Sequence, residues 1–178
     1  MTTLLGLSGS LRAQSSNRKL INAAAQIFAP DRYIAGNLRL PLYDGDIETA
    51  QGIPAEVQTL ADHIRVADAV IISTPEYNKA LSGVLKNALD WVSRTDGNPW
   101  QDKPVAIMSA AAGRSGGERA QFSLRLAMVA FRPQLLHGPE MMLADSNNQF
   151  DAEGHLVNDR ARKTLTALMA DLRALTTP

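Results

Sequence analysis

The chain has 178 residues, enough for one domain with a core of its own. Its 18 basic residues equal its 18 acidic ones, which argues against binding nucleic acid or membrane through bulk charge. There is no cysteine, so disulfides, thiolate nucleophiles and cysteine-ligated metals are excluded. Without a basic signal-peptide start or a run of 18 apolar residues, the expected location is the cytoplasm.

Short apolar runs predict five strands in chain order, over residues 4–7, 33–40, 69–72, 105–108 and 139–143. Helical spacing of apolar residues predicts five helices, over residues 17–29, 54–64, 81–92, 118–131 and 161–175. The third and fourth strands are apolar without alternation, which is typical of central parallel strands covered on both faces. This order predicts an α/β fold: a doubly wound, five-stranded parallel sheet with helices on both faces, in a single domain over residues 1–178.

The remaining segments are interpreted as surface features. Asp44, Asp46 and Glu48 form an acid-rich run that we expect to be a solvated loop. Residues 145–159 are polar and turn-rich, which indicates a surface excursion before the last helix. Trp100 follows a Gly-Asn-Pro turn and is predicted to plug a loop onto the surface or onto a partner subunit.

Residues 9–17, the loop after the first strand, lead into the start of a helix. Ligands of open α/β sheets bind outside the carboxyl ends of the strands, and free N–H groups at a helix start attract anions. Arg12 can pair bidentately with a phosphate, whereas an ordinary helix cap beside a solvated arginine is an equally supported reading of the composition. The loop matches neither G-x-G-x-x-G nor G-x-x-x-x-G-K-[ST], so a dinucleotide fingerprint and an NTPase loop are unsupported.

Residues 74–83 form the second such loop, after the third strand. Its polar side chains Glu76, Tyr77 and Asn78 follow Pro75, and a flat heteroaromatic ring can lie on the tyrosine. The alternative is an ordinary turn in which Ser82 caps the next helix.

The third loop, residues 109–117, follows the fourth strand and is rich in alanine and glycine. Its small side chains let a ligand approach backbone amides closely. It also matches G-x-S-x-G at Ser115, with Asp145 or Asp151 and then His155 downstream, so a serine hydrolase that uses Ser115 is a rival hypothesis. The short chain and the lack of an H-G-G-G motif count against that hypothesis, which also leaves the first two loops unexplained.

Together the loops carry three motifs that resemble those of the NADPH-dependent FMN reductase family, in the flavodoxin-like superfamily. The closest similarity is to its bacterial chromate/quinone reductase branch. The motifs are Gly9-Ser10-Leu11-Arg12 with Ser15 and Asn17; Pro75-Glu76-Tyr77-Asn78 with Gly83, Leu85-Lys86-Asn87-Ala88 and Asp90-Trp91; and Gly116-Gly117 with Arg119-Ala120-Gln121 and Leu124-Arg125. The resemblance covers about residues 4–142 and fades beyond them.

The resemblance implies a sheet of order 2-1-3-4-5 and a bound FMN, with NADH or NADPH as co-substrate. The FMN contacts that it implies are Ser10, Arg12, Ser15, Ser16 and Asn17 around the phosphate, Pro75, Glu76, Tyr77 and Asn78 along the ribityl chain and isoalloxazine, and Ala110, Ala111, Ala112 and Gly113 beside the ring. Alanine stands at positions 110 and 111 where the branch often has hydroxyl residues, so flavin affinity or redox potential can differ.

The implied reaction is ping-pong hydride transfer through FMN to a quinone, with chromate, ferric chelates, azo and nitro compounds as further acceptors. The flavin performs that chemistry, so neither a metal nor a catalytic side chain is required. An electron carrier or FMN-binding regulator is the non-enzymatic alternative, which the neutral charge disfavours. The sequence favours neither NADH nor NADPH, because no basic pocket for a ribose 2′-phosphate stands out.

The expected partner is a second copy of the chain. The resemblance implies a homodimer or homotetramer, and the apolar faces of helices 81–94 and 118–131 are wider than a sheet would cover. Arg94 is a candidate substrate contact near the flavin. The alternative for Arg94 is a charge favoured by the dipole at the end of its helix.

Overall fold

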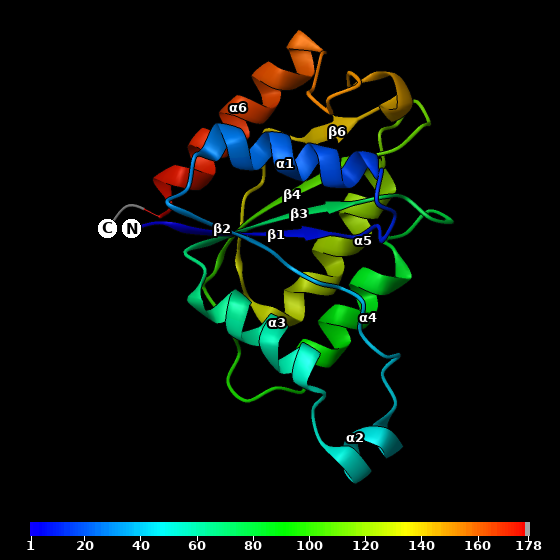
Figure 1. Ribbon diagram of the computed structural model, residues 1–178, viewed down its shortest axis with the longest axis vertical. Coiled ribbons are helices and arrows are strands. Elements are labelled where there is room, and N and C mark those ends of the chain that lie inside the picture. The colour runs from blue at the N-terminus through cyan, green and yellow to red at the C-terminus, as the bar shows by residue number, and fades with distance from the viewer. Residues whose placement is uncertain (177–178) are drawn as a thin grey trace.

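The computed structural model describes residues 1–176, which form an α/β fold around one parallel sheet (Figure 1). Its strands are β1 (Thr3–Ser8), β2 (Arg32–Ala35), β3 (Ala69–Thr74), β4 (Pro104–Ala110), β5 (Gln134–Leu135) and β6 (Met141–Leu143). The strand order β2-β1-β3-β4-β5 confirms the predicted order 2-1-3-4-5. β3 is buried along its whole length, as its unbroken apolar sequence predicts.

The fifth position of the sheet is filled by two short strands rather than one. β5 pairs with Pro104 and Val105 of β4, and β6 pairs farther along the same strand with residues 108–110. The strand predicted over residues 139–143 is therefore shorter than expected, and β5 was not predicted. Pro139 lies between the two strands and has no N–H to donate to the ladder, which is consistent with the interruption.

β2 ends at Ala35, five residues earlier than predicted, because the chain turns away from β1. Gly36 still donates its N–H to the carbonyl of Gly6 at 2.9 Å. The next residue, Asn37, then accepts a hydrogen bond from the backbone N–H of Arg39 at 3.0 Å. Such a local asparagine turn replaces ladder pairing and directs the chain away from the sheet edge.

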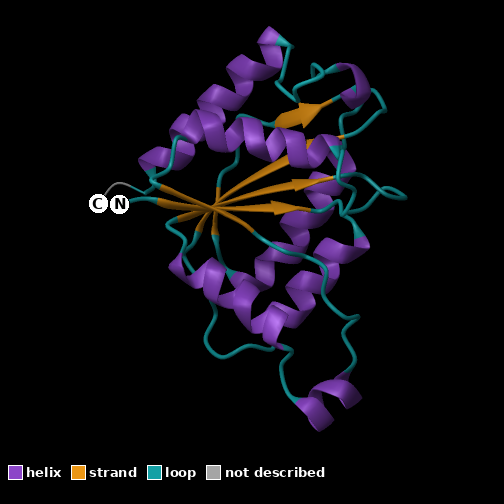
Figure 2. Cartoon of the chain, viewed as in Figure 1, coloured by secondary structure: helices purple, strands orange, loops and turns teal. Residues whose placement is uncertain are grey.

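The helices cover both faces of the sheet, as the alternation of elements predicts (Figure 2). They are α1 (Ser16–Phe28), α2 (Gly45–Gln51), α3 (Ala55–Val66), α4 (Gly83–Val92), α5 (Glu118–Met128) and α6 (Asp159–Ala174), with 3-10 turns η1 (Val129–Phe131) and η2 (Ser146–Asn148). In Figure 1, α1 and α6 lie on one face, and α3, α4 and α5 lie on the other. None of the helices within residues 1–176 is long and apolar enough to cross a bilayer.

α2 corrects one prediction, because the acid-rich run forms a helix instead of a loop. The Asp44 carboxylate caps this helix by accepting the N–H of Asp46 at 2.9 Å. No α2 residue is buried, and Figure 1 shows α2 standing away from the sheet. The segment therefore carries no apolar periodicity that would have revealed it.

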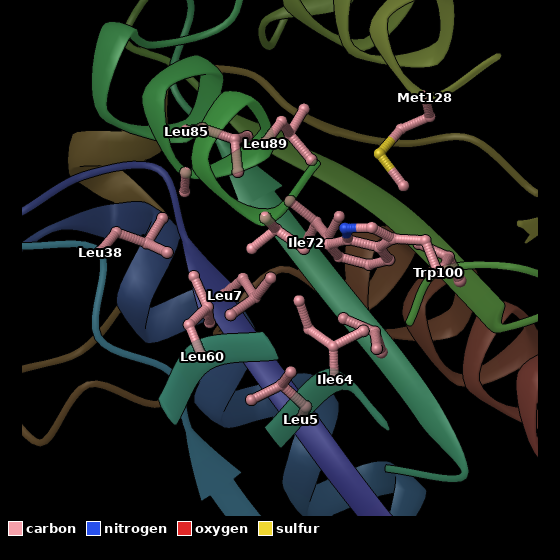
Figure 3. Packing of buried hydrophobic residues seen from close by; sticks show 14 of the residues in the cluster. Leu5, Leu7, Leu38, Leu60, Ile64, Ile72, Leu85, Leu89, Trp100 and Met128 are labelled. Carbon is pink, nitrogen blue, oxygen red and sulfur yellow. The ribbon is translucent and has the colours of Figure 1, made fainter. Parts of the chain in front are cut away.

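Two hydrophobic clusters lie on either side of the sheet, and the larger is shown in Figure 3. Trp100 belongs to it with an exposure of only 1%, so its predicted surface position is wrong. Asn98 accepts the N–H of Trp100 at 3.3 Å, and the indole lies 6.4 Å from the ring of Phe131. The turn therefore points the indole inward, where burying its large apolar area stabilises the fold.

Candidate functional site

A cleft of about 420 Å³ lies where β1, β3 and β4 end and their loops begin. Its lining comprises Ser10, Arg12, Ser15, Ser16, Asn17, Pro75, Glu76, Tyr77, Ala110, Ala111, Ala112, Ser146 and Asn147. The structure thus brings together every residue predicted from the three loops except Asn78 and Gly113, which do not line the cleft. Loops that are far apart in the sequence meet here because carboxyl ends of parallel strands share one edge of the sheet.

The first loop presents hydrogen-bond donors without partners at the start of α1. Ser15 caps the helix by accepting the N–H of Asn17 at 3.2 Å, which confirms that this loop contains a helix cap. The Arg12 side chain is exposed and forms no hydrogen bond or ion pair within residues 1–176. The backbone N–H groups of Leu11 and Ser16 also lack acceptors in that range. Free donors at the positive end of a helix favour an anion.

Asn17 connects the first loop with two strand ends. Its side chain is 3% exposed, and its Oδ1 accepts hydrogen bonds from the Ser73 hydroxyl at 2.7 Å and from the Ala110 N–H at 3.0 Å. Its Nδ2 donates to the Ala110 carbonyl at 2.9 Å. The amide therefore fixes the backbone of Ala110 beside the cleft and leaves one N–H without an acceptor among the described residues.

The second loop is a tight turn that presents Tyr77 to the cleft. The backbone groups of Tyr77 and Ala80 exchange two hydrogen bonds of 3.1 Å. Asn78 and Lys79 between them have positive φ values of 49° and 68°, as in a type I′ turn. Asn78 lies at the tip of this turn, which is why it does not line the cleft, while half of the tyrosine surface stays exposed.

Glu76 ties the second loop to the start of α5. Gly117 precedes that helix and has no side chain with which to cap it. The Glu76 carboxylate instead accepts the backbone N–H of Arg119 at 3.1 Å. This contact satisfies a donor at the helix start and engages the one carboxylate that lines the cleft. Ser82 likewise caps α4, as the alternative interpretation of this loop predicted.

The third loop is held by polar contacts behind the cleft. The Ser109 hydroxyl donates to the Gly116 carbonyl at 2.7 Å, and Gln121 Nε2 donates to that hydroxyl at 2.9 Å. Both groups are fully buried. Ala110, Ala111 and Ala112 consequently form a fixed wall of small side chains, against which a flat ligand can approach the backbone.

Ser146 and Asn147 line the cleft but were missed from the sequence, where they belong to the expected surface excursion. The N–H of Ser146 donates to the Ala111 carbonyl at 3.1 Å, and the Ser16 hydroxyl lies 3.5 Å from the Ser146 carbonyl. These residues follow β6. The rule that ligands bind beyond the carboxyl ends of strands would have found them if it had been applied to the fifth strand as well.

The residues of the rival serine hydrolase are not assembled. His155 Nδ1 lies 3.2 Å from Asp151, and the imidazole lines a cavity with α1 residues. Ser115 lies in the third loop and has no hydrogen bond to His155 within residues 1–176. A nucleophilic serine needs a base within hydrogen-bond reach, so this arrangement does not support a hydrolase.

Arg94, the candidate substrate contact, lies outside the cleft. Its Nε lies 3.1 Å from both carboxylate oxygens of Glu48 on α2, and the Tyr43 hydroxyl donates to the same carboxylate at 3.0 Å. Arg94 lowers the pKa of Glu48, and Glu48 in turn raises the pKa of Arg94. The pair fastens α2 to the end of α4.

This ion pair predicts an acid-dependent release of α2. Because the pKa of Glu48 is lower in the folded state, the pair stabilises α2 above the unfolded-state pKa and is lost as pH falls through the folded value. Backbone amide NMR shifts of α2 should therefore move, between neutral pH and about pH 3, toward those of Glu48→Gln at neutral pH. Identical α2 shifts in the wild type and Glu48→Gln at neutral pH would contradict the tether.

Comparison with known proteins adds independent information to this geometry. The sequence profile of the NADPH-dependent FMN reductase family matches residues 2–148. An NAD(P)H-dependent FMN reductase of Pseudomonas aeruginosa is 43% identical over 164 residues, which cover 91% of this chain and 88% of the relative. A quinone reductase of Escherichia coli is 39% identical over 172 residues, with 94% and 90% covered. The flavoenzyme FerB of Paracoccus denitrificans, an NAD(P)H:(acceptor) oxidoreductase, superposes with a TM-score of 0.87 at 28% identity, covering 99% of this chain and 97% of FerB.

Proposed function

The chain belongs to the NADPH-dependent FMN reductase family, and from this premise we propose that it binds FMN in the cleft and reduces quinones with NADH or NADPH. It is an NAD(P)H-dependent oxidoreductase rather than an electron carrier. The observation that carries the proposal is the convergence of residues from the first two family motifs and of the alanines of the third loop on one cleft at the strand ends. Chromate, ferric chelates, azo and nitro compounds are further proposed acceptors.

The residues of the cleft fit the two ends of FMN. Arg12, Ser10, Ser15 and Ser16 supply a guanidinium and hydroxyls beside the start of α1, a setting suited to a phosphate dianion. The Glu76 carboxylate would repel that phosphate, but the hydrogen bond that it accepts from the Arg119 N–H offsets this repulsion. Asn17 contributes to FMN binding in two ways: it holds the Ala110 backbone in place, and it offers its remaining amide N–H.

The other end of the cleft suits the isoalloxazine. Pro75 and Tyr77 supply a flat apolar surface to the cleft, and Ala110, Ala111 and Ala112 supply backbone groups. Asn78 and Gly113 do not line the cleft. Their proposed contacts with FMN would be made from the second and third loops, outside the cleft itself. Because positions 110 and 111 carry no hydroxyls, hydrogen bonds to the ring edge there come from the backbone.

The chemistry divides between the cofactor and the chain. When bound, FMN supplies ping-pong hydride transfer from NAD(P)H to the acceptor. The chain would hold the phosphate at the start of α1 and would position the ring through Tyr77 and the alanine wall. No proton-transferring side chain is needed at the cleft.

The proposal extends to assembly and location. We propose a homodimer or homotetramer, supported by the exposed side chains of Phe122, Leu126 and Val129 on α5 and η1. A groove of about 540 Å³ lies beside them between α4 and α5. Exposed apolar surface of this kind is typical of subunit contacts. We further propose that residues 1–178 act as one FMN-binding domain in the cytoplasm.

Arg12→Ala should weaken FMN binding by about tenfold to a hundredfold, because a charge-assisted contact to phosphate contributes about 1.5–3 kcal/mol. Quenching of FMN fluorescence measures the affinity, and Arg160→Ala, a change at an exposed arginine in the first turn of α6, is the control. Equal affinities for Arg12→Ala and wild type would mean that the first loop only caps α1.

Reconstitution tests the function as a whole. The protein mixed with FMN and freed of excess should show flavin absorbance and oxidise NADH or NADPH when a quinone is supplied. Failure to retain FMN, or NAD(P)H oxidation that is the same with and without the protein, would refute the proposal. Labelling of Ser115 by a serine-directed probe on a colourless protein would instead support the hydrolase.

A further inference from the structure

The first loop separates the cleft from a second cavity, of about 260 Å³, on the side of β2. Ser10 lines both spaces, whereas Leu11 lines only the second cavity and Arg12 lines only the cleft. Arg39, which follows β2 in the chain, also lines the second cavity. The peptide that joins Leu11 to Arg12 therefore lies in the wall between the two spaces.

Arg39 bonds to the backbone of this wall. Its Nη2 donates to the Leu11 carbonyl at 3.1 Å. The neighbouring carbonyls of Ser10 and Arg12 instead accept donors that lie within three residues of them. Among residues 1–176, Arg39 is the only side chain from a distant part of the sequence that bonds to a backbone carbonyl of this loop. The orientation of the Leu11–Arg12 peptide therefore depends on Arg39.

The geometry of that peptide determines what the contact does on the other side of the wall. The Leu11–Arg12 peptide is trans, and in a trans peptide the C=O and N–H bonds point in opposite directions. Because the Leu11 carbonyl points to Arg39, the Arg12 N–H points away from it. That N–H has no acceptor within residues 1–176. The contact thus leaves one more backbone donor for the cleft, next to the Arg12 side chain.

The backbone from which Arg39 extends is itself fixed. The Asn37 side chain accepts the N–H of Arg39 at 3.0 Å. Leu38, between them, is 3% exposed and belongs to the hydrophobic cluster shown in Figure 3. Leu11 packs against the same cluster. Both ends of the contact therefore rest on one core, which holds the guanidinium and the carbonyl at a defined separation.

Arg18 allows the contact to be distinguished from the effect of charge alone. It lines the same cavity, is exposed, and forms no hydrogen bond or ion pair within residues 1–176. Each arginine can attract a phosphate through its charge, an attraction that salt screens beyond about 8 Å at physiological ionic strength. Since only Arg39 bonds to the loop backbone, a difference between the two arginines measures that bond.

We propose that Arg39 is a positioning residue for the FMN phosphate. By holding the Leu11 carbonyl, it directs the Arg12 N–H to the cleft and fixes the form of the first loop that receives the phosphate. This inference rests on the proposed function, because it takes the cleft to hold FMN. Arg39 does not line the cleft, so it acts through the loop rather than by contact with the cofactor.

The binding test compares Arg39→Met with Arg18→Met in about 0.15 M salt, with quenching of flavin fluorescence as the readout. Arg39→Met should weaken FMN binding by about tenfold, and Arg18→Met by no more than about twofold. Neither variant should change the affinity for riboflavin, which has the same ring system and no phosphate. Both arginines are exposed, so each variant should fold, and its urea midpoint without FMN verifies this.

Three results of the binding test would overturn the inference. Equal losses of FMN affinity in the two variants would leave charge as the explanation. An equal loss of FMN and riboflavin affinity in Arg39→Met would mean that Arg39 shapes the cleft as a whole. Unchanged FMN affinity in Arg39→Met would mean that the loop receives the phosphate without the contact.

A second measurement follows the peptide itself, in the protein without FMN. The residual dipolar coupling of a backbone amide reports the direction of its N–H bond. The Arg12 coupling should fit the structure in the wild type and in Arg18→Met, and depart from it in Arg39→Met. The same coupling in all three proteins would overturn the inference while the reductase function stands. Should the wild type bind no FMN, the proposed function fails, and this coupling still decides whether Arg39 orients the loop.

Discussion

Replacing Asn17 with alanine should lower the free energy of unfolding by about 3–5 kcal/mol and abolish the retention of FMN. Three hydrogen bonds of 2.7–3.0 Å disappear with the amide. The Ser73 hydroxyl and both backbone groups of Ala110 would then be buried without those partners, and each unsatisfied group costs about 1–3 kcal/mol. Urea unfolding of the protein without FMN measures the first effect, and flavin absorbance after desalting measures the second.

Gln26→Ala is the matched control for this experiment. Gln26 is an exposed amide on the same helix with no side-chain hydrogen bond within the described residues, so its replacement should change the unfolding free energy by less than about 0.5 kcal/mol. If Asn17→Ala is as mild as Gln26→Ala, Asn17 does not join the first loop to the ends of β3 and β4, and the account of the alanine wall is wrong.

Gly116→Ala should destabilise the protein by about 3 kcal/mol and distort the cleft. Gly116 has a φ of 62°, and an added Cβ would lie 2.6 Å from the carbonyl carbon of Met142 and 2.9 Å from the backbone nitrogen of Ala144. These are backbone atoms, so the clash can be relieved only by moving the third loop away from the segment after β6. The unfolding free energy and the FMN affinity should fall together.

Gly113→Ala gives the comparison within the same loop. No atom lies within 4 Å of the Cβ added there, so this change should leave the unfolding free energy within about 0.5 kcal/mol of wild type. Similar stabilities for the two variants would show that close packing of Gly116 against Met142 does not hold the third loop.

The sequence predicted the parts of the fold that local pattern controls. The unbroken apolar runs of β3 and β4 indicate central strands because both faces of these strands are covered, and the structure buries them. β5 has two residues and carries too little pattern to be recognised, whereas β6 was predicted over residues 139–143 but extends over only three of them. α2 was missed because it buries no side chain, and its contact with Arg94 joins residues 46 positions apart.

In the candidate site, too, local sequence pattern predicted some features, while others depend on contacts between distant parts of the chain. Motifs identified the loops that line the cleft, because motif residues keep their spacing within one loop. The role of Asn17 depends on Ser73 and Ala110, which are 56 and 93 residues away, and no local spacing encodes those contacts.

A crystal structure of the protein grown with excess FMN tests the central claim most directly. The account predicts one FMN in the cleft, with its phosphate beside Arg12 at the start of α1 and its ring between Tyr77 and Ala111. An empty cleft in a protein that binds FMN one-to-one in solution, or an FMN bound elsewhere on the molecule, would contradict it.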